Sequence, residues 1–256
     1  MGEFVRFDRD RDTVTVTLSN PAKRNVLSLG VLQDLIDAFG RAGDSDATGI
    51  VLAAEGPVFS AGHNFGDMKG ATYDEAHGVF ALCSSLMQMM HSVPQPIVAR
   101  VHALATAAGC QLVATCDLAV AARSAGFAIP GGKGGLFCHT PAVAIARSMP
   151  RKFAVEMAMT GDVIDAETAH RWGLVNSVVD DAELDGAVAG LLARATRGSA
   201  FSKALGKRTL YRQMDMPESD AYVFASAVMA EAAVGDAAQE GITAFLEKRE
   251  PHFTGE

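Results

Sequence analysis

The sequence predicts an α/β fold with a helical C-terminal part. Predicted strands and helices alternate through the first part of the 256-residue chain, and from Asp180 onward the apolar pattern is almost wholly helical. No Pro-, Gly- or Ser-rich linker and no internal repeat divides the chain. Such an alternation is typical of one α/β core. We therefore predict a core over residues 1–198 and a C-terminal helical segment over residues 199–256.

Four segments are predicted to be strands, because each is a short run rich in apolar and β-branched residues between turn residues. The first, Thr13–Leu18, alternates as TVTVTL and ends where Asn20 and Pro21 follow. The others are predicted at residues 50–53, at residues 96–101 and from Asp117 onward.

Capping residues indicate where the helices begin. Ser28 is predicted to cap a helix that runs to about residue 43, with apolar residues on one side. A second helix is predicted from about residue 73 to residue 91, and a short one within residues 103–122. Thr140 is predicted as the cap of another helix, with Pro141 in its first turn. Asp165 and Glu167 open a short helix that ends near Gly173.

Composition narrows the classes of partner. The chain is 49% hydrophobic and carries a net charge of −8 without a basic block, so nucleic-acid binding has little support. No apolar run reaches the roughly 18 residues that a membrane span needs. The first residues, MGEFVRFDRDRD, are too charged for a secretory signal peptide. We therefore expect a cytoplasmic protein that binds neither nucleic acid nor membrane.

The sequence offers no familiar metal, redox or nucleotide motif. The four cysteines, at 83, 110, 116 and 138, have no zinc or redox spacing, and we expect buried reduced thiols and no metal site. The run GGKGG lacks the first glycine of a Walker loop, because Phe127 stands there. The motifs G-x-S-x-G, H-E-x-x-H and the dinucleotide G-x-G-x-x-G are also absent. Serine hydrolase, zinc hydrolase and Rossmann dehydrogenase functions therefore have weak support.

Five ordered segments resemble those of the enoyl-CoA hydratase/isomerase family, the crotonase superfamily. Together they cover nearly the whole chain, and five in the family's order make the resemblance specific. The segments ATAAGCQLVATCD and GLFCHTP further resemble one branch of that family. The five are NPAKRNVLS (20–28), VFSAGHNFGDM (58–68), ALATAAGCQLVATCDLAVAA (103–122), MTGDVIDAETAHRWGLVNSVV (159–179) and QEGITAFLEKREPHF (239–253).

The resemblance implies a crotonase-like core, a spiral of ββα units, with a C-terminal helical segment used for oligomerisation. It implies an acyl-CoA thioester as substrate, with no cofactor beyond the coenzyme A of that substrate, and a homotrimer or hexamer. In this family two backbone N–H groups hold the thioester oxygen and stabilise an enolate. By position these are the N–H groups of His63 and Ala108. Ala108 would begin a helix, where unbonded N–H groups and the helix dipole favour negative charge. Glycine is usual at that position, so alanine requires a negative φ.

Two departures from the family pattern concern the glutamates that place and activate water in hydratases. The first falls on Gln111, one helical turn after Ala108, and the second on Gly131. Neither residue ionises, although an amide still holds water through hydrogen bonds. Asn64 also stands where the family usually has aspartate.

Other side chains are candidates for proton transfer. His139 lies in a segment that lines the pocket of relatives, where it would be either a titrating group or a rim residue. The His63 ring either takes part in catalysis or faces solvent or the coenzyme. Cys138 is a weaker candidate nucleophile, and His102 is expected to be structural.

The resemblance also implies residues that contact coenzyme A. Lys23 and Arg24 are natural partners of its phosphates, and Lys248 would reach the nucleotide from the tail, within one subunit or across a subunit interface. The complete predicted set is Lys23, Arg24, Val26, Ala61, Gly62, Asn64, Phe65, Gly109 and Lys248.

Three functions remain open on the sequence. The chain could hydrate enoyl-CoA in fatty-acid metabolism. It could catalyse another acyl-CoA reaction, such as a double-bond shift, thioester hydrolysis or decarboxylation. It could also bind acyl-CoA without catalysis, a reading that Gln111 and Gly131 favour.

Overall fold

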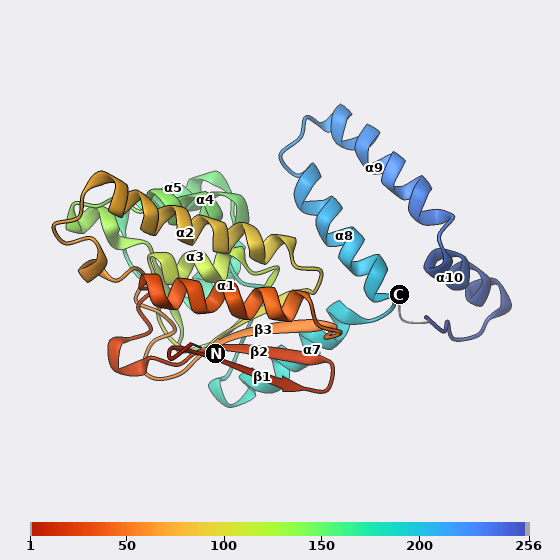
Figure 1. Ribbon diagram of the computed structural model, residues 1–256, viewed down its shortest axis with the longest axis horizontal. Helices are drawn as coiled ribbons and strands as arrows, with labels where there is room; N and C mark the ends of the chain where they lie inside the picture. Colours follow the sequence, from red (N-terminus) through yellow and green to blue (C-terminus); the bar gives the residue numbers. More distant parts are fainter. Residues whose placement is uncertain (1, 254–256) are drawn as a thin grey trace.

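Two sheets form the centre of the molecule in the computed structural model, which describes residues 2–253 (Figure 1). The larger sheet has the strand order β1-β2-β3-β4-β6-β9, in which β1 pairs antiparallel with β2 and every other pair is parallel. Its strands are β1 (Val5–Asp10), β2 (Thr13–Leu18), β3 (Gly49–Ala54), β4 (Ile97–Val101), β6 (Leu118–Ala122) and β9 (Ser177–Val179). The smaller sheet contains β5 (Ala105–Thr106), β7 (Gly126–Ala128) and β8 (Ile164–Asp165) in that order.

Helices connect and cover these strands, so the predicted α/β class is confirmed. The α-helices are α1 (Leu29–Gly43), α2 (Tyr73–Ser92), α3 (Ala108–Thr115), α4 (His139–Ser148), α5 (Arg151–Thr160), α6 (Ala166–Trp172), α7 (Leu184–Thr196), α8 (Ala200–Gln213), α9 (Glu218–Ala233) and α10 (Asp236–Glu247). Short 3-10 turns are η1 (Pro21–Lys23), η2 (Phe65–Asp67), η3 (Pro130–Gly134) and η4 (Asp181–Glu183).

Strand β3 is apolar throughout because both of its faces are buried. Successive side chains of a strand point to opposite faces, and here both faces are covered. Ile50 and Leu52 belong to the main core, with residues of α1 and α2, whereas Val51 and Ala53 pack with the apolar side of α7. Figure 1 shows α1 and α2 on one side of the larger sheet and α7 on the other.

The predicted caps are confirmed for two helices. The Ser28 hydroxyl accepts a hydrogen bond from Val31 N (3.4 Å) at the start of α1, and the Asp165 carboxylate accepts one from Thr168 N (2.7 Å) at the start of α6. Such bonds satisfy donors that the first turn of a helix leaves free. Helix α2 begins with a capping box that sequence analysis did not single out, formed by Thr72 and Glu75.

The start of α4 differs from the prediction. Ala142 N donates to Cys138 O (3.0 Å), so Cys138 is the residue before the helix and the helix begins at His139 rather than after Thr140. Pro141 does lie in the first turn, where its missing N–H has no helical partner to lose. Thr140 lines both of the cavities described below.

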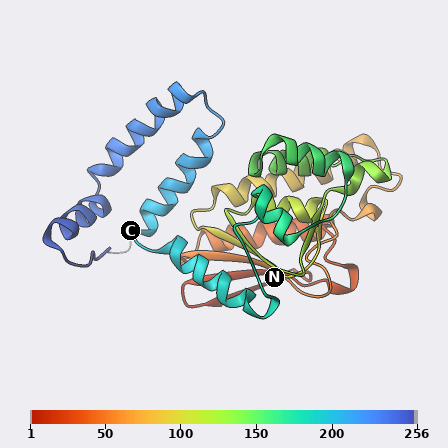
Figure 2. The same cartoon turned by 180° about the vertical axis from the view of Figure 1, so that it is seen from behind.

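Helices α8 to α10, here called the C-terminal arm, project away from the core (Figures 1 and 2). The N-cap of α8 is Ser199. Helix α9 buries none of its residues, and large apolar side chains of α9 and α10 are exposed, among them Val223, Met229, Phe245 and Leu246. No single helix of residues 2–253 is long and apolar enough to cross a membrane. The pair α9 and α10, bent by 70°, passes that test together on length and composition alone.

A buried polar network ties α8 to the core. Lys207 Nζ lies 2.8 Å from Asp117 Oδ2, and the Tyr211 hydroxyl donates to Asp117 Oδ1 at 2.8 Å. The ammonium of Lys207 also donates to two backbone carbonyl oxygens, Met90 O and Gln95 O, both at 2.9 Å. Asp117 accepts a further bond from Ile97 N (2.7 Å). These bonds compensate two charges whose side chains are largely removed from water.

Candidate active site

Asn25 holds the first predicted coenzyme-contacting segment against the segment that follows β3. Its side chain is 1% exposed and donates to the carbonyl oxygens of Glu55 (2.8 Å), Val58 (3.1 Å) and Phe59 (3.2 Å). Its oxygen accepts a bond from Asn20 N at 2.9 Å. Because a buried amide is favourable only when it is satisfied, this side chain fixes the two segments relative to each other. Sequence analysis missed Asn25, although it lies inside NPAKRNVLS.

The backbone beside His63 leaves one N–H without a partner. Leu27 and His63 form an isolated parallel bridge, in which Leu27 N donates to Gly62 O (2.8 Å) and Asn64 N donates to Leu27 O (3.3 Å). The bridge thus uses the carbonyl group of Gly62 and the N–H group of Asn64, which lie on either side of His63 N along the chain. Within the described residues, His63 N donates no backbone hydrogen bond.

The loop that carries His63 packs directly on the loop that leads into α3. A side chain at Gly62, whose φ is +85°, would place its Cβ 2.8 Å from Ala107 Cβ and 3.1 Å from Ala108 N. A Cβ at Gly109 would lie 2.6 Å from Ser60 O. Only glycine permits approaches this close. The structure therefore brings the predicted residues Ala61, Gly62 and His63 together with Ala108 and Gly109.

Ala107 turns the chain into α3 with φ 51° and ψ −121°, a region that alanine rarely occupies. The positive φ thus falls on Ala107, and Ala108 does not share it. No side chain caps α3, and Ala108 N makes no backbone hydrogen bond within residues 2–253. The amide of Ala108 is therefore an unbonded donor at the positive end of a helix.

A cavity of about 480 Å³, here called the smaller cavity, collects these donors. Both His63 and Ala108 line it, together with Ala61 and Phe65 of the predicted coenzyme-contacting set. Most of the remaining lining is apolar, contributed by Met68, Phe80, Pro130, Leu136, Phe137 and Pro141. Two donors in a largely apolar cavity suit a ligand with one polar oxygen attached to an apolar group.

The His63 ring packs against Phe80 instead of facing solvent. The ring centroids lie 5.3 Å apart in an edge-on arrangement, and both ring nitrogens are buried without a hydrogen-bond partner among the described residues. Burial lowers the pKa of His63 because it disfavours the charged imidazolium. The ring is therefore neutral near pH 7, whereas the backbone N–H of the same residue is available to a ligand.

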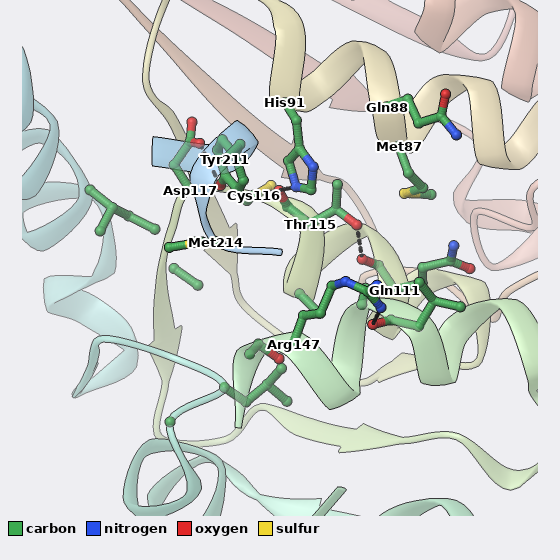
Figure 3. A pocket seen from close by; sticks show the side chains of 18 of the residues that line it. Met87, Gln88, His91, Gln111, Thr115, Cys116, Asp117, Arg147, Tyr211 and Met214 are labelled. Carbon is green, nitrogen blue, oxygen red and sulfur yellow. Dashed lines mark hydrogen bonds between the residues drawn. The ribbon is translucent and has the colours of Figure 1, made fainter. Parts of the chain in front are cut away.

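Gln111 is separated from the smaller cavity. Gln111 is 4% exposed and lines a second cavity of about 920 Å³, here called the larger cavity. This cavity lies between α2, α3, α4 and the C-terminal end of α8 (Figure 3). The Oε1 atom of Gln111 has no hydrogen-bond partner within residues 2–253. The larger cavity contains neither His63 nor Ala108. The position of the family's first glutamate thus faces a different space from the two unbonded amides.

Gly131 leaves no room for a side chain. A Cβ there would lie 2.1 Å from Leu136 O and 2.7 Å from Cys138 Sγ. The loop closes on itself, since Leu136 N donates to Gly131 O (3.0 Å) and Gly131 N donates to Cys138 Sγ (3.2 Å). A glutamate at this position would require the whole turn after Pro130 to be rebuilt.

His139 and Cys138 both line the smaller cavity but differ in exposure. His139 is exposed at its rim, with its ring 5.1 Å from that of Phe137. Cys138 is buried, and burial raises the pKa of its thiol, which does not favour a thiolate nucleophile. All four cysteines are free and buried, as the sequence predicts. His102, expected to be structural, has Nε2 2.8 Å from Gly56 O.

The remaining predicted residues divide into near and distant ones. Lys23 and Arg24 are exposed and Val26 is partly buried on the segment that Asn25 anchors, and Ala61 N donates to Arg24 O at 3.0 Å. Asn64 caps η2 through its bonds to Gly66 N and Asp67. Lys248, by contrast, follows α10 at the far end of the arm (Figure 1). In residues 2–253, no group of three His, Cys, Asp or Glu residues is placed to hold a metal ion.

Comparison with known proteins identifies the family of the chain. The model of the family described as enoyl-CoA hydratase/isomerase matches residues 9–256. The chain belongs to this family. It is 45% identical to the rat protein named enoyl-CoA hydratase domain-containing protein 3, mitochondrial, over 95% of this chain and 82% of the rat protein. The human protein of that name is 43% identical over 94% of this chain and 80% of its own length.

Solved structures of this family share its fold. The crystal structure of human enoyl coenzyme A hydratase domain-containing protein 3 superposes with a TM-score of 0.94, at 42% identity, over 98% of this chain and all of the human one. An enoyl-CoA hydratase of Mycobacterium smegmatis also gives a TM-score of 0.94, at 41% identity, over 97% of this chain and 98% of that one. These matches confirm the crotonase fold and place the chain in the branch named after domain-containing protein 3.

The relatives contradict one expectation. The rat, mouse and human proteins all carry the word mitochondrial in their names, which points away from the cytoplasmic location expected from the sequence. That expectation was based on first residues unlike a secretory signal, and the lack of such a signal does not distinguish a cytoplasmic from a mitochondrial protein.

Proposed function

We propose that this chain binds the thioester of an acyl-CoA and polarises its carbonyl group between the backbone N–H groups of His63 and Ala108. The observation that carries the proposal is that these two donors are unbonded and line one largely apolar cavity. Donors fixed in advance stabilise the negative charge that develops on the oxygen when an enolate forms. Family membership supports an acyl-CoA substrate and a role in fatty-acid metabolism.

The proposed chemistry differs from hydration by two carboxylates. Gly131 has no space for a glutamate, and Gln111 lies in the larger cavity and does not ionise. We therefore favour a reaction that depends on the polarised carbonyl, such as a double-bond shift, thioester hydrolysis or decarboxylation. Binding of acyl-CoA without catalysis is the second candidate, and the closed turn at Gly131 is the observation that favours it.

The coenzyme itself would extend over the exposed segment of Lys23 and Arg24, whose charges suit its phosphates. Lys248 follows α10 on the arm that projects from the core, so we expect a second copy of the chain to take part in its proposed contact with the coenzyme. The exposed apolar side chains of α9 and α10 support a homotrimer or hexamer, because burial between copies would remove them from water.

A pair of substitutions at residue 63 tests the oxyanion proposal. His63→Ala keeps the backbone N–H, whereas His63→Pro removes it without breaking a bond that the structure contains. The infrared carbonyl band of bound hexanoyl-CoA should shift to lower frequency with the unchanged protein and with His63→Ala. It should not shift with His63→Pro. If folded His63→Pro, checked by circular dichroism, retains the shift, His63 N is not the donor.

Crotonyl-CoA separates this function from hydration. We expect the protein to bind crotonyl-CoA, measured by calorimetry, while its absorbance at the enoyl band decays no faster than in buffer. Hydration well above that background would show that the chain activates water without the two glutamates, and would overturn the preference stated above.

A further inference from the structure

The two cavities meet at Thr140, which lines both of them. Thr140 lies in the first turn of α4, beside the cavity that holds the two unbonded amides. The two cavities therefore adjoin at Thr140. Apolar residues that line the larger cavity include Met87, Ala114, Val143 and Ala144.

Gln111 lines the larger cavity with an unused amide. The residue is 4% exposed, and within residues 2–253 neither end of its side-chain amide makes a hydrogen bond. Only Oε1 of this amide is buried without a partner in the described part of the chain, and Oε1 accepts hydrogen bonds, so a ligand carboxylate would instead meet the amide through its Nε2 N–H groups. An amide N–H donates well to a carboxylate.

Arg147 supplies a positive charge to the lining of the larger cavity. It follows Thr140 by seven residues on α4, and therefore lies on the same face about 10 Å farther along the helix. Its Nη1 donates to Val143 O (3.4 Å), and its Nε lies 3.6 Å from Asp215 Oδ1, with both charged side chains mostly exposed. Exposed pairs of this kind are weak, so a ligand anion competes with Asp215 readily. Figure 3 shows Arg147 and Gln111 below Thr115, with His91 and Gln88 above it.

Two carboxylates also line the larger cavity, those of Asp117 and Asp215. Asp117 is already paired with Lys207 and hydrogen-bonded by Tyr211 and Ile97 N. Asp215 is the carboxylate that would have to yield. The larger cavity thus adjoins the proposed thioester site at Thr140 and combines apolar lining residues with the donors of Arg147 and Gln111.

We propose that the acyl group ends in a carboxylate, bound in the larger cavity by Arg147 and Gln111. This inference rests on the proposed function and specifies its substrate class: the coenzyme A monothioester of a dicarboxylic acid of medium chain length. The thioester oxygen occupies the smaller cavity, and the methylene chain passes Thr140.

Two probes that differ only at the far end of the chain test the inference. Octanoyl-CoA ends in a methyl group and octanedioyl-CoA in a carboxylate, and their affinities are measured by calorimetry with the full chain. We expect octanedioyl-CoA to bind about tenfold more tightly, because a guanidinium–carboxylate pair is charge-assisted. Arg147→Met should abolish this preference while octanoyl-CoA still binds. Asp215→Asn should increase the preference, because it removes the competing carboxylate.

Arg151→Met is the matched control, since Arg151 is an exposed arginine of the neighbouring helix α5 that lines neither cavity. It should leave both affinities unchanged. Equal binding of the two thioesters, or an equal loss of both in Arg147→Met, would overturn the inference and leave the proposed function standing. If neither thioester binds, the proposed function fails as well.

Discussion

Ala107 has a backbone conformation that strains alanine, and it directly precedes the unbonded amide of Ala108. Its φ of 51° and ψ of −121° are held by a hydrogen bond from Ala107 N to Ala128 O (2.9 Å) and by the close packing of Gly62. The ψ angle of Ala107 sets the plane of the peptide that carries Ala108 N. The strained residue therefore determines where that donor points.

Replacing Ala107 with glycine should stabilise the protein. Strain of this kind costs about 1–3 kcal/mol, and the added freedom of glycine in the unfolded chain offsets roughly 0.5–1 kcal/mol of the gain. We expect the free energy of unfolding in urea to rise by about 1 kcal/mol. Ala103→Gly, at a loop position without positive φ, should lower it instead. A loss of stability in Ala107→Gly equal to that of Ala103→Gly would show that Ala107 is not strained.

The sequence predicted the two proposed oxyanion donors but not the surroundings of Gly131 and Gln111. His63 and Ala108 could be proposed from sequence, because their segments resemble the family's oxyanion segments. The closed turn at Gly131 could not be proposed from sequence. Atoms of Leu136 and Cys138 fill the space that a side chain at residue 131 would need, and the spacing of residues in the sequence does not reveal this turn. The separation of Gln111 from the smaller cavity likewise depends on how α3 and α4 pack.

At the scale of elements, helix α3 links the two functional regions. Its first residue carries the unbonded amide. Cys116 and Asp117, which follow its last residue, line the larger cavity together with Tyr211 and Met214 at the C-terminal end of α8. Asp117 holds α8 through Lys207 and Tyr211. The buried carboxylate of Asp117 therefore attaches the arm to the core through its bonds with Lys207 and Tyr211.

Asp117→Asn should be strongly destabilising, because it leaves the Lys207 ammonium buried without an opposite charge. Breaking a buried pair in this way costs about 3–5 kcal/mol, measured by urea unfolding. The double variant Asp117→Asn with Lys207→Met should recover part of the loss. Asp185→Asn is the control, since its pair with Arg100 is largely exposed on the Asp185 side and should matter by less than about 0.5 kcal/mol. A small effect of Asp117→Asn would mean that the network does not support the fold.

Elements with strong periodicity or caps were predictable, and short or polar ones were not. Helix α1 and strands β2 and β3 follow from apolar patterning, and Asp165 with Gly173 marks both ends of α6. Strand β1 was missed because its sequence, VRFDRD, is mostly charged, yet it pairs along its whole length with β2. Strands β5 and β8 have two residues each, too few for any pattern, and exist only because tertiary contacts align them.

At the scale of the whole molecule, two partly buried histidines couple stability to pH. Burial lowers the pKa of His63 and also that of His91, which stacks on Tyr211 with ring centroids 4.0 Å apart. In the unfolded chain both rings take up a proton near pH 6.5, whereas in the folded chain they do so only at lower pH. Protonation therefore favours the unfolded state as the pH falls below that value.

The free energy of unfolding should be level above about pH 6.5 and should decline between about pH 6.5 and 5. His63→Phe, which preserves an aromatic ring beside Phe80, should reduce the slope in this window, and so should His91→Phe. The measurement is urea unfolding at several pH values. Slopes identical to that of the unchanged protein would show that neither ring resists protonation.

The short length of α3 gives the arrangement a mechanical consequence. Its eight residues span only about 12 Å between the peptide that carries Ala108 N and the residues that anchor the arm. In the oligomer proposed above, a displacement of the arm by a neighbouring copy would therefore be transmitted through α3 to the proposed oxyanion donor. We expect a dissociated subunit to hold an acyl-CoA more loosely than the assembled protein does.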